Sequence, residues 1–340
     1  MIFLGDLACP PIKAVDFNNS VEKLGIFDGE VAVVNLEAVI LSGRKPIMAT
    51  LFNHESVLDS LQKKAKKVIV SLANNHMYDY PVEIMQTKSF LENRGVGVFG
   101  LQNTDGSFDP YEFEDEDGYY AFFGHCWNLY SATNPNRVND VKIVDCGYDV
   151  FLKVVKLYIE ANPHRKVFCF MHWNYDLELL PFPMHVKLSH DLIDSGVEGV
   201  IGSHSHVTHL VEEYKGKIIA YCLGNFYLPS GIYFNGQLNY PDESKNTIGI
   251  RIRKGRTDVL RFETDKSEPI KFKDSVSPSA FAPFATSDIK AYTKLFRKRR
   301  AKRLFVPVFD SYSGISYGMK NLWAISRVKL IKQILKILHK

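Results

Sequence analysis

The chain contains a series of short, almost uninterrupted apolar runs that are separated by segments with helical periodicity. The runs are rich in Val, Ile and Phe and rarely alternate with polar residues, as is typical of strands covered on both faces. Strands that alternate with helices in this way predict an α/β layered fold. The expected strands are 2–6, 31–37, 67–76, 96–100, 119–125, 166–173, 197–204, 217–226 and 247–254.

Four of the intervening segments have the spacing of amphipathic helices: 55–67, 81–95, 147–163 and 183–196. The second of them begins with Pro and ends with Gly, which fits a helix start and stop. The acidic, turn-rich stretch over 101–118 is expected to be a surface excursion or a hairpin.

Composition limits the classes of protein to which the chain could belong. With 46% hydrophobic and 24% charged residues, the composition is that of an ordinary globular protein. No run of 18 apolar residues occurs, and the amino-terminal segment does not have the pattern of a secretory signal, so we expect a cytoplasmic protein without a transmembrane helix. The five cysteines are odd in number and show no zinc-knuckle spacing, which indicates reduced core thiols.

The charge is distributed unevenly along the 340 residues. Residues 290–340 contain fourteen Lys or Arg and one acid and so carry +13, which leaves −9 for the first 289 residues. We therefore expect a catalytic domain over 1–285 and a basic helical tail over 286–340.

Within this tail, a basic cluster over 294–305 precedes apolar residues that recur at helical spacing: Leu322, Ile325, Val328, Ile331, Leu335 and Leu338. Such a helix either attaches to an anionic membrane surface, which would put the protein at the inner face of the membrane, or packs on the domain or on a second copy of the chain. Nucleic acid is the weakest alternative, because nothing else in the chain suggests it.

Polar side chains follow several of the predicted strands, at the point where each strand ends. Ligands of open α/β sheets bind beyond the carboxyl ends of the strands, so we expect these side chains to converge: Asp6, Glu37, Asn74, Asn75, His76, His172, His204 and His206. Carboxylates and imidazoles together suit divalent ions such as Mn, Fe, Co, Ni or Zn. Their number favours two ions, about 3.5–4 Å apart, over one.

A single histidine at a strand end is more often a surface or core residue than a metal ligand. The joint occurrence at five strand ends favours the metal site. His125 and His209 have no place in that pattern, and we interpret both as structural.

The same residues fall in motifs that resemble a known family. The motifs are "GD" at 5–6, "NLE" at 35–37, "ANNHMYDY" at 73–80, "MHWN" at 171–174, "VIGSHSHV" at 200–207 and "YCLGNF" at 221–226. In this order they resemble the bacterial capsule-synthesis proteins of the poly-γ-glutamate type, within the calcineurin-like metallophosphoesterase superfamily. The resemblance covers about residues 1–250. It implies a four-layer α/β/β/α sandwich with a dinuclear metal centre on the loops at the strand ends.

The resemblance also implies a set of ligands for two divalent transition-metal ions. Asp6 and His206 would bind the first metal, and Glu37 would bridge the two ions. Asn75, His172 and His204 would bind the second metal.

The residues implied to act in catalysis are His76 and Asp79. His76 would protonate the leaving oxygen or stabilise the transition state while a metal-bound hydroxide attacks. Asp79 would either orient the imidazole of His76 or hold its loop.

Some positions depart from the family's motifs. Ala8 stands where many members of the superfamily have a further histidine ligand for the first metal. Asn174 stands where Gly is usual, Asp176 where Glu is usual, and His185 near the usual Gln. These three residues, with Asn74 and Asn225, are expected to line the substrate pocket.

The resemblance implies metal-dependent hydrolysis of a phosphoester in capsule or surface-polysaccharide biosynthesis, on a phosphorylated or polymer-linked substrate. Two alternatives remain open: a weakly or non-catalytic component of a polymer synthesis or export complex, and an amide hydrolase that acts on a γ-linked polymer. The enzyme is favoured because the predicted ligands and His76 are all present.

Overall fold

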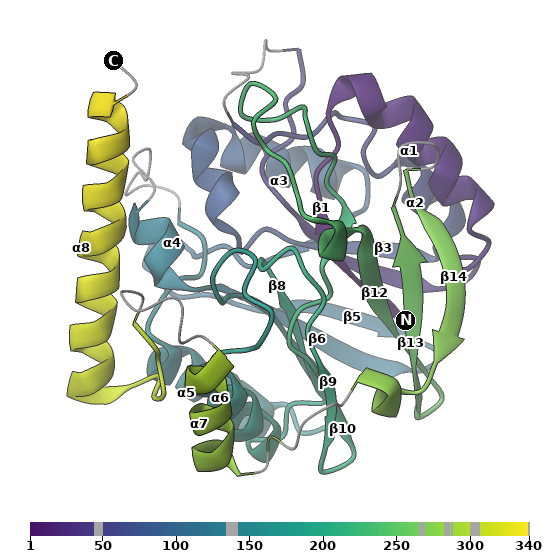
Figure 1. Ribbon diagram of the computed structural model, residues 1–340. Coiled ribbons are helices and arrows are strands. Elements are labelled where there is room, and N and C mark those ends of the chain that lie inside the picture. Colours follow the sequence, from purple (N-terminus) through teal and green to yellow (C-terminus); the bar gives the residue numbers. More distant parts are fainter. Residues whose placement is uncertain are drawn as a thin grey trace.

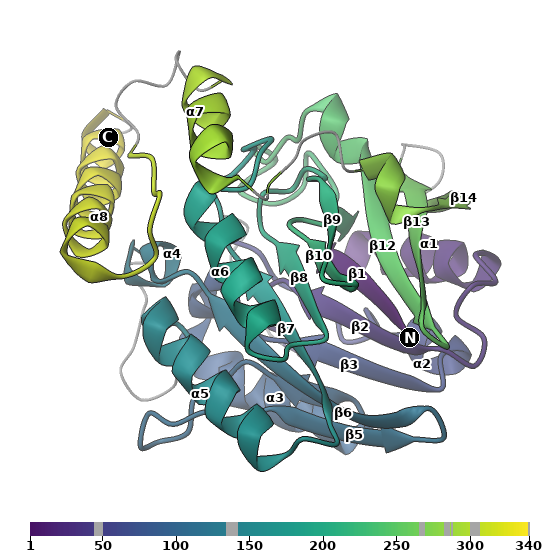
Figure 2. The same ribbon diagram turned by 90° about the horizontal axis from the view of Figure 1, so that it is seen from below.

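The computed structural model describes the whole chain except residues 44–49, 134–141, 265–268, 282–285, 287, 300–306 and 339–340. Two β-sheets pack against each other, and helices cover the outer face of each sheet (Figure 1 and Figure 2). The predicted four-layer α/β/β/α sandwich is therefore confirmed.

The first sheet has eight strands in the described part of the chain. Four of them are parallel to one another: β1 (Ile2–Leu7), β2 (Val31–Leu36), β3 (Lys67–Ser71) and β4 (Gly97–Phe99). On the other side of β1 the sheet continues with antiparallel neighbours: β12 (Asn246–Arg253), β13 (Arg256–Glu263) and β14 (Lys271–Val276). A short eighth strand, β11 (Asn225–Tyr227), pairs with β1 in parallel.

The second sheet has six strands, counted over the same described residues. Its order is β5 (Tyr111–Asp115), β6 (Gly118–Cys126), β7 (Lys166–His172), β8 (Gly199–Ser203), β10 (Lys217–Ala220) and β9 (Val211–Tyr214). The four inner strands are parallel, and the two edge strands are antiparallel to their neighbours. The stretch over 101–118 was expected to be a surface excursion or a hairpin. It supplies β5, which forms a hairpin with β6, so the second of these expectations is confirmed.

Three hydrophobic clusters correspond to the three interfaces between the four layers. The outer face of the first sheet is covered by α1 (Pro11–Lys23), α2 (Asp59–Lys64) and α3 (Ile84–Asn93). The outer face of the second sheet is covered by α4 (Asn128–Thr133), α5 (Tyr148–Ala161) and α6 (Pro183–Asp194). Between the sheets, the ring of Phe3 on β1 lies 5.0 Å from that of Phe168 on β7. Strands covered on both faces explain the unbroken apolar runs.

The prediction of one strand over 217–226 is wrong, because the chain passes there from one sheet to the other. We call residues 221–224, which separate β10 from β11, the crossing segment. Gly224 has a φ of 77°, which ends the extended conformation. The crossing segment bonds to both sheets: Leu223 N donates to Gly202 O (3.0 Å), and Asp6 N donates to Gly224 O (3.0 Å). It therefore ties β8 of one sheet to β1 of the other.

The basic tail folds against the second sheet's helical layer. It forms α7 (Ile289–Arg299) and α8 (Gly314–Leu338). Tyr292, Phe296 and Ala324 join the same hydrophobic cluster as α5 and α6, and Tyr292 OH donates to Pro181 O (2.8 Å). Packing of the tail on the domain, one of the alternatives that the sequence left open, is thus observed. Part of the basic cluster, over 300–305, lies outside the described residues.

The sequence predicted that the apolar residues of α8 form one stripe on one face of the helix, and this prediction is wrong. Ile325 and Val328 are half-buried, but Leu322 and Ile331 are exposed, because the helix turns its small residue Ala324 inward. The side chains of Leu335 and Leu338 lie outside the described residues. Within the part of the chain that is described, no helix has both the length and the apolar character needed to cross a membrane.

Gly5→Ala should destabilise the fold, because a Cβ at this position would lie 1.9 Å from Gly224 O in the crossing segment. Forcing the two backbones apart costs about 1–3 kcal/mol, which urea unfolding would measure. Gly318→Ala is the matched control, because nothing lies within 4 Å of a Cβ there and Ala favours a helix by about 0.5–1 kcal/mol. Equal stability of Gly5→Ala and the unmodified protein would contradict the close approach.

Candidate metal centre

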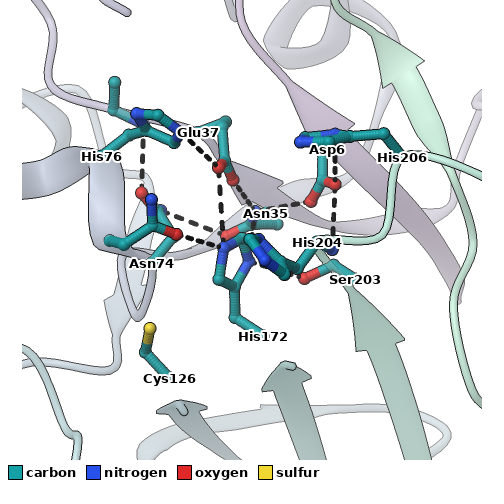
Figure 3. A network of polar contacts seen from close by, with 12 residues as sticks. Asp6, Asn35, Glu37, Asn74, His76, Cys126, His172, Ser203, His204 and His206 are labelled. Carbon is teal, nitrogen blue, oxygen red and sulfur yellow. Dashed lines mark hydrogen bonds and ion pairs between the residues drawn. The ribbon is translucent and has the colours of Figure 1, made fainter. Parts of the chain in front are cut away.

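The carboxyl ends of parallel strands from both sheets meet at one point, where the predicted polar residues gather (Figure 3). Asp6 lies near the end of β1, and Glu37 directly follows β2. His172 ends β7, and His204 directly follows β8. Convergence is a consequence of strand direction, since β1 and β2 are parallel in one sheet and β7 and β8 in the other.

One group of possible ligand atoms comes from both sheets. Asp6, Glu37 and His172 each offer an atom, and these atoms all lie within 4.8 Å of one another. All three residues are buried. His172 Nε2 lies 3.6 Å from Glu37 Oε1 and 2.9 Å from Asn75 Oδ1. The structure thus brings four of the sequence-predicted residues together.

A second group consists of Asp176, His204 and His206, whose ligand atoms also lie within 4.8 Å of one another. His204 Nε2 lies 3.3 Å from Asp176 Oδ1. Asp176 was predicted to line the substrate pocket, and the structure places its carboxylate among the possible metal ligands. His206 Nδ1 lies 3.4 Å from Asp6 Oδ2, which joins the two groups.

Asn225 on β11 orients His206, since its Oδ1 lies 2.8 Å from His206 Nδ1. A proton on Nδ1 leaves the Nε2 lone pair of that ring available to a metal. Asn225 also lines a cavity beside the site, so its predicted contact with substrate stays a prediction.

Asn35 was not predicted, although it lies at the centre of the site. Its Nδ2 donates to Asp6 Oδ1 (2.7 Å) and Glu37 Oε2 (2.5 Å), so it holds the two carboxylates in place (Figure 3). Its position in the "NLE" motif, two residues before Glu37, puts it on the same face of an extended segment. That spacing was the signal from which it could have been found.

Several buried polar atoms of the site have no hydrogen-bond partner among the described residues. They are Glu37 Oε1 and both ring nitrogens of His204. Buried polar groups are nearly always paired, because an unpaired group loses its hydration without compensation. Carboxylate and imidazole atoms left unpaired beside one another form a donor set that fits a divalent transition metal.

The pKa values of the site are set by burial and by neighbouring charge. Burial, with the added effect of neighbouring imidazoles, holds the pKa of His172 well below its usual range. Burial lowers the pKa of His204 to about 4, although Asp176 opposes the shift. Both rings are therefore neutral at pH 7, as metal ligands must be. Burial and then the charge of Asp6 raise the pKa of Glu37 well above its usual range, an effect that a bound cation would offset.

His76 lies beside the ligand groups on the short 3₁₀ helix η1 (Asn75–Asp79). Its Nδ1 lies 2.9 Å from Asp79 Oδ2, and its Nε2 lies 3.9 Å from Glu37 Oε1. Asp79 Oδ2 also accepts from Leu51 N (3.2 Å). Asp79 therefore makes the contacts for both predicted roles: it orients the imidazole and holds the loop.

Backbone strain is concentrated around the site. Ala38, Asn174, His204 and His206 all have positive φ values, of 77°, 72°, 94° and 59°. Non-glycine residues rarely adopt this conformation, and the surrounding structure must enforce it. Each of these four residues is a possible metal ligand or lies within two residues of one in the chain. The strained backbone is therefore found where ligand side chains are oriented.

Three residues predicted to bind substrate have side chains that are fully buried and bonded inward. Asn74 donates to Leu36 O (2.8 Å) and accepts from Ala38 N (3.2 Å). Asn174 Oδ1 accepts from Phe182 N (2.9 Å) and lies 2.8 Å from His185 Nδ1. The ring of His185 therefore lies in the core.

These contacts belong to a buried chain of hydrogen bonds that shapes the loop carrying Asp176. His185 Nε2 lies 3.2 Å from Tyr148 OH, and Asn174 Nδ2 lies 3.4 Å from His209 Nδ1. His209 Nε2 donates to Glu178 O (2.5 Å). The structural interpretation of His209 is confirmed, as is that of His125, whose Nε2 donates to Cys146 O (2.8 Å). All five cysteines are free, as predicted.

The fold and the cluster together define an α/β protein with a candidate metal centre between the carboxyl ends of two sheets. Within that class, the chain belongs to the bacterial capsule synthesis protein family, PGA_cap, whose model matches residues 11–230.

Relatives of known name are distant. The chain is 25% identical to the PGA biosynthesis protein CapA of Bacillus subtilis over 189 residues, which are 53% of this chain and 47% of that protein. It is also 25% identical to the capsule biosynthesis protein CapA of Bacillus anthracis over 196 residues, 50% of this chain and 42% of that protein. Each match therefore spans less than half of the relative's length.

Among the solved structures with a weak likeness to the chain, two illustrate its extent. One is a hypothetical protein from Thermus thermophilus, with 14% identity and a TM-score of 0.46 over 80% of this chain and 99% of that one. The other is the NAD nucleotidase of Haemophilus influenzae, with 10% identity and a TM-score of 0.42 over 98% of this chain and 60% of that one. At these TM-scores neither structure bears on the activity of the chain.

His204→Ala should lose bound transition metal while the fold persists, because neither ring nitrogen of His204 makes a hydrogen bond within the described structure that the substitution would break. Elemental analysis after metal loading would measure the loss, and circular dichroism would report the fold. His164→Ala is the matched control, since this histidine is exposed and remote from the site. Metal content equal to that of the control would remove His204 from the ligand set.

The metal-free protein should lose stability as the pH falls from about 6.5 towards 4. Burial lowers the pKa of both His125 and His209 to about 4, against about 6.5 in the unfolded chain. The unfolded state therefore binds more protons in this window, and each ring costs about 2 kcal/mol of unfolding free energy between pH 7 and pH 5. Urea unfolding in EDTA at the two pH values would measure it.

A variant pair tests the source of this pH dependence. His209→Gln should reduce the difference between the two pH values by about 2 kcal/mol, whereas His164→Asn, at an exposed position, should leave it unchanged. If the difference in unfolding free energy between the two pH values is the same in His209→Gln as in the unmodified protein, the ring of His209 is not held neutral in the folded state.

Proposed function

We propose that the protein is a metal-dependent hydrolase of phosphoesters that acts in capsule or surface-polysaccharide biosynthesis. The observation that carries the proposal is the buried convergence of Asp6, Glu37, His172, His204 and His206, with atoms left unpaired and His76 beside them. A purely structural cluster has no reason to keep unpaired carboxylate and imidazole atoms next to a partly exposed histidine.

Two divalent ions are proposed for the two ligand groups. Asp6, Glu37 and His172 form one group, and Asp176, His204 and His206 form the other. When bound, such ions supply Lewis-acid chemistry: they lower the pKa of water and neutralise charge on a phosphoryl group. Asn35 and Asn225 keep the ligands oriented by their hydrogen bonds to Asp6, Glu37 and His206.

His76 is the proposed proton donor to the leaving oxygen. Asp79 holds Nδ1 of this ring at 2.9 Å, so the opposite nitrogen, Nε2, is directed towards Glu37 and the site. The side chain of His76 is 17% exposed, whereas those of His172 and His204 are 1–2% exposed. His76 therefore has the access to substrate that proton transfer requires, and its role does not compete with metal binding.

A cavity beside the site gives the proposed substrate a place to bind. Its volume is about 1020 Å³, and two of its lining residues also contact His206: Asn225 by a hydrogen bond and Tyr240 with a ring centroid 4.9 Å away. Lys13 and Lys23 of α1 line it as well. Asp16 lies on the same wall, and the net positive charge that remains favours an anionic substrate, such as a phosphorylated or acidic polymer end.

His76→Ala should retain bound metal but lose turnover of an aryl phosphoester by about 10²–10⁴-fold, the usual contribution of general acid catalysis. Steady-state kinetics of the metal-loaded protein would measure kcat, and elemental analysis would show that the metal remains. His164→Ala again serves as the control for loss of a histidine. Full activity in His76→Ala would exclude the proposed role.

Activity profiling tests the proposal as a whole. The metal-loaded protein is assayed against phosphomonoesters, phosphodiesters, nucleotide-linked sugars and a γ-linked glutamyl peptide. Phosphoester turnover that His204→Ala abolishes supports the proposal. Cleavage of the peptide alone would make the protein an amide hydrolase. No turnover with any substrate, in protein of full metal content, would leave a non-catalytic component of a polymer synthesis complex.

A further inference from the structure

Helix α8 is apolar on two sides, and only one of them is covered by the described part of the protein. Its inner side faces the helical layer: Ala324 lies in the hydrophobic cluster, Asn321 Nδ2 donates to Asn128 Oδ1 (3.0 Å), and the ring of Tyr317 lies 5.9 Å from that of Phe309. Figure 1 and Figure 2 show α8 along one edge of the molecule, with no other described element on its outer side.

The outer side carries a second row of apolar residues, which we call the outer stripe. Its members are between 46% and 84% exposed: Ile315, Met319, Leu322, Trp323, Leu330 and Ile334. At 3.6 residues per turn they fall within about 120° of arc, the width of a buried helix face. A row of this length on a solvent-facing helix is characteristic of a surface that another phase or molecule covers.

Exposed cations lie on the helix that carries the outer stripe and on α7, to which that helix is linked. Lys329 is exposed on α8, and α7 exposes Lys290, Lys294, Lys298 and Arg299. The two helices are held together through Asp310, which pairs with Arg297 of α7 (2.9 Å) and with Lys320 of α8 (2.6 Å). No acidic residue occurs from 311 to 340, so α8 itself carries only basic charged side chains, of which Lys320 is paired with Asp310.

We propose that the outer stripe and the cations of α7 and α8 bind the surface of an anionic lipid bilayer, with α8 lying in the plane of the interface. An interfacial helix of this kind buries apolar side chains at the boundary between headgroups and acyl chains while its basic residues contact anionic headgroups. Trp323 in the stripe suits that boundary, where amphipathic aromatic rings concentrate.

The outer stripe together with the cations favours a bilayer over a second copy of the chain and over nucleic acid. A second copy of the chain that packed α8 against α8 would cover the stripe but would bring like charges together. Nucleic acid would neutralise the cations but would leave the apolar row in water. An anionic bilayer covers the apolar row and neutralises the cations at the same time.

The test is co-sedimentation of the full-length protein with vesicles of phosphatidylcholine alone or mixed with phosphatidylglycerol. We expect binding to the anionic vesicles that weakens at high salt. Leu322→Gln/Leu330→Gln should reduce the affinity at least about tenfold, since it removes two large apolar groups from the interface. The matched control is Ile12→Gln/Val15→Gln, which removes from α1 two apolar residues that are even more exposed and should leave the affinity unchanged.

A charge variant tests the second half of the surface. Lys294→Gln/Lys298→Gln/Lys329→Gln should lower the affinity for anionic vesicles by about fivefold per residue, equivalent to about 1 kcal/mol for each basic side chain near the surface. All substituted side chains are partly or fully exposed, and thermal unfolding would verify that every variant remains folded.

Light scattering and DNA binding distinguish the other occupants. A monomer that binds anionic vesicles through both sets of residues supports the proposal. No vesicle binding would overturn it. A dimer that Leu322→Gln/Leu330→Gln dissociates would then assign the stripe to a second copy. Binding of duplex DNA that only the lysine variant weakens would assign the cations to nucleic acid.

Discussion

The crossing segment is the constraint on which the rest of the site depends. It leaves the second sheet after β10 and enters the first at β11, and it hydrogen-bonds to Gly202 on one side and to Asp6 on the other. Glycines allow the approach: a Cβ at Gly202 would lie 2.0 Å from Tyr221 O, and one at Gly5 would lie 1.9 Å from Gly224 O. The segment therefore sets the distance between strand ends that carry Asp6 and His204.

The layered fold and the ends of the strands could be predicted from sequence, because both follow from local patterns. An apolar run that ends in Asp6 or His172 marks a buried strand and its terminus at once, and parallel strands put their termini at one edge. The hairpin of β5 was also foreseeable from its turn-rich surroundings. The passage from β10 to β11 was not, since residues 217–226 read as one apolar run and only the φ of Gly224 breaks it.

The parts of the site that could not be predicted depend on contacts between distant segments. Asn35 donates hydrogen bonds to Asp6 and Glu37, which belong to two different strand ends. Asp176 lies next to His204 because a buried chain of hydrogen bonds shapes the loop that carries Asp176. Asn174 and His185 looked like pocket residues because they depart from the family's motifs in the stretch that follows His172. Their burial comes from packing of α6 against the second sheet, which no local pattern specifies. The two-sided character of α8 likewise required its neighbours to be known.

The pairing of Asp6 with Glu37 has a thermodynamic consequence. Both carboxyl groups are fully buried, and one Asn35 amide is shared between them. Keeping two acids out of water without a full set of partners costs free energy of folding. A cation that binds only the native chain returns that free energy by mass action, about 2.7 kcal/mol at a hundredfold excess over its Kd. With the proposed ions bound, the folded population of this protein would depend on the concentration of free metal around it, so that scarcity of metal would lower its abundance before it limits the proposed chemistry.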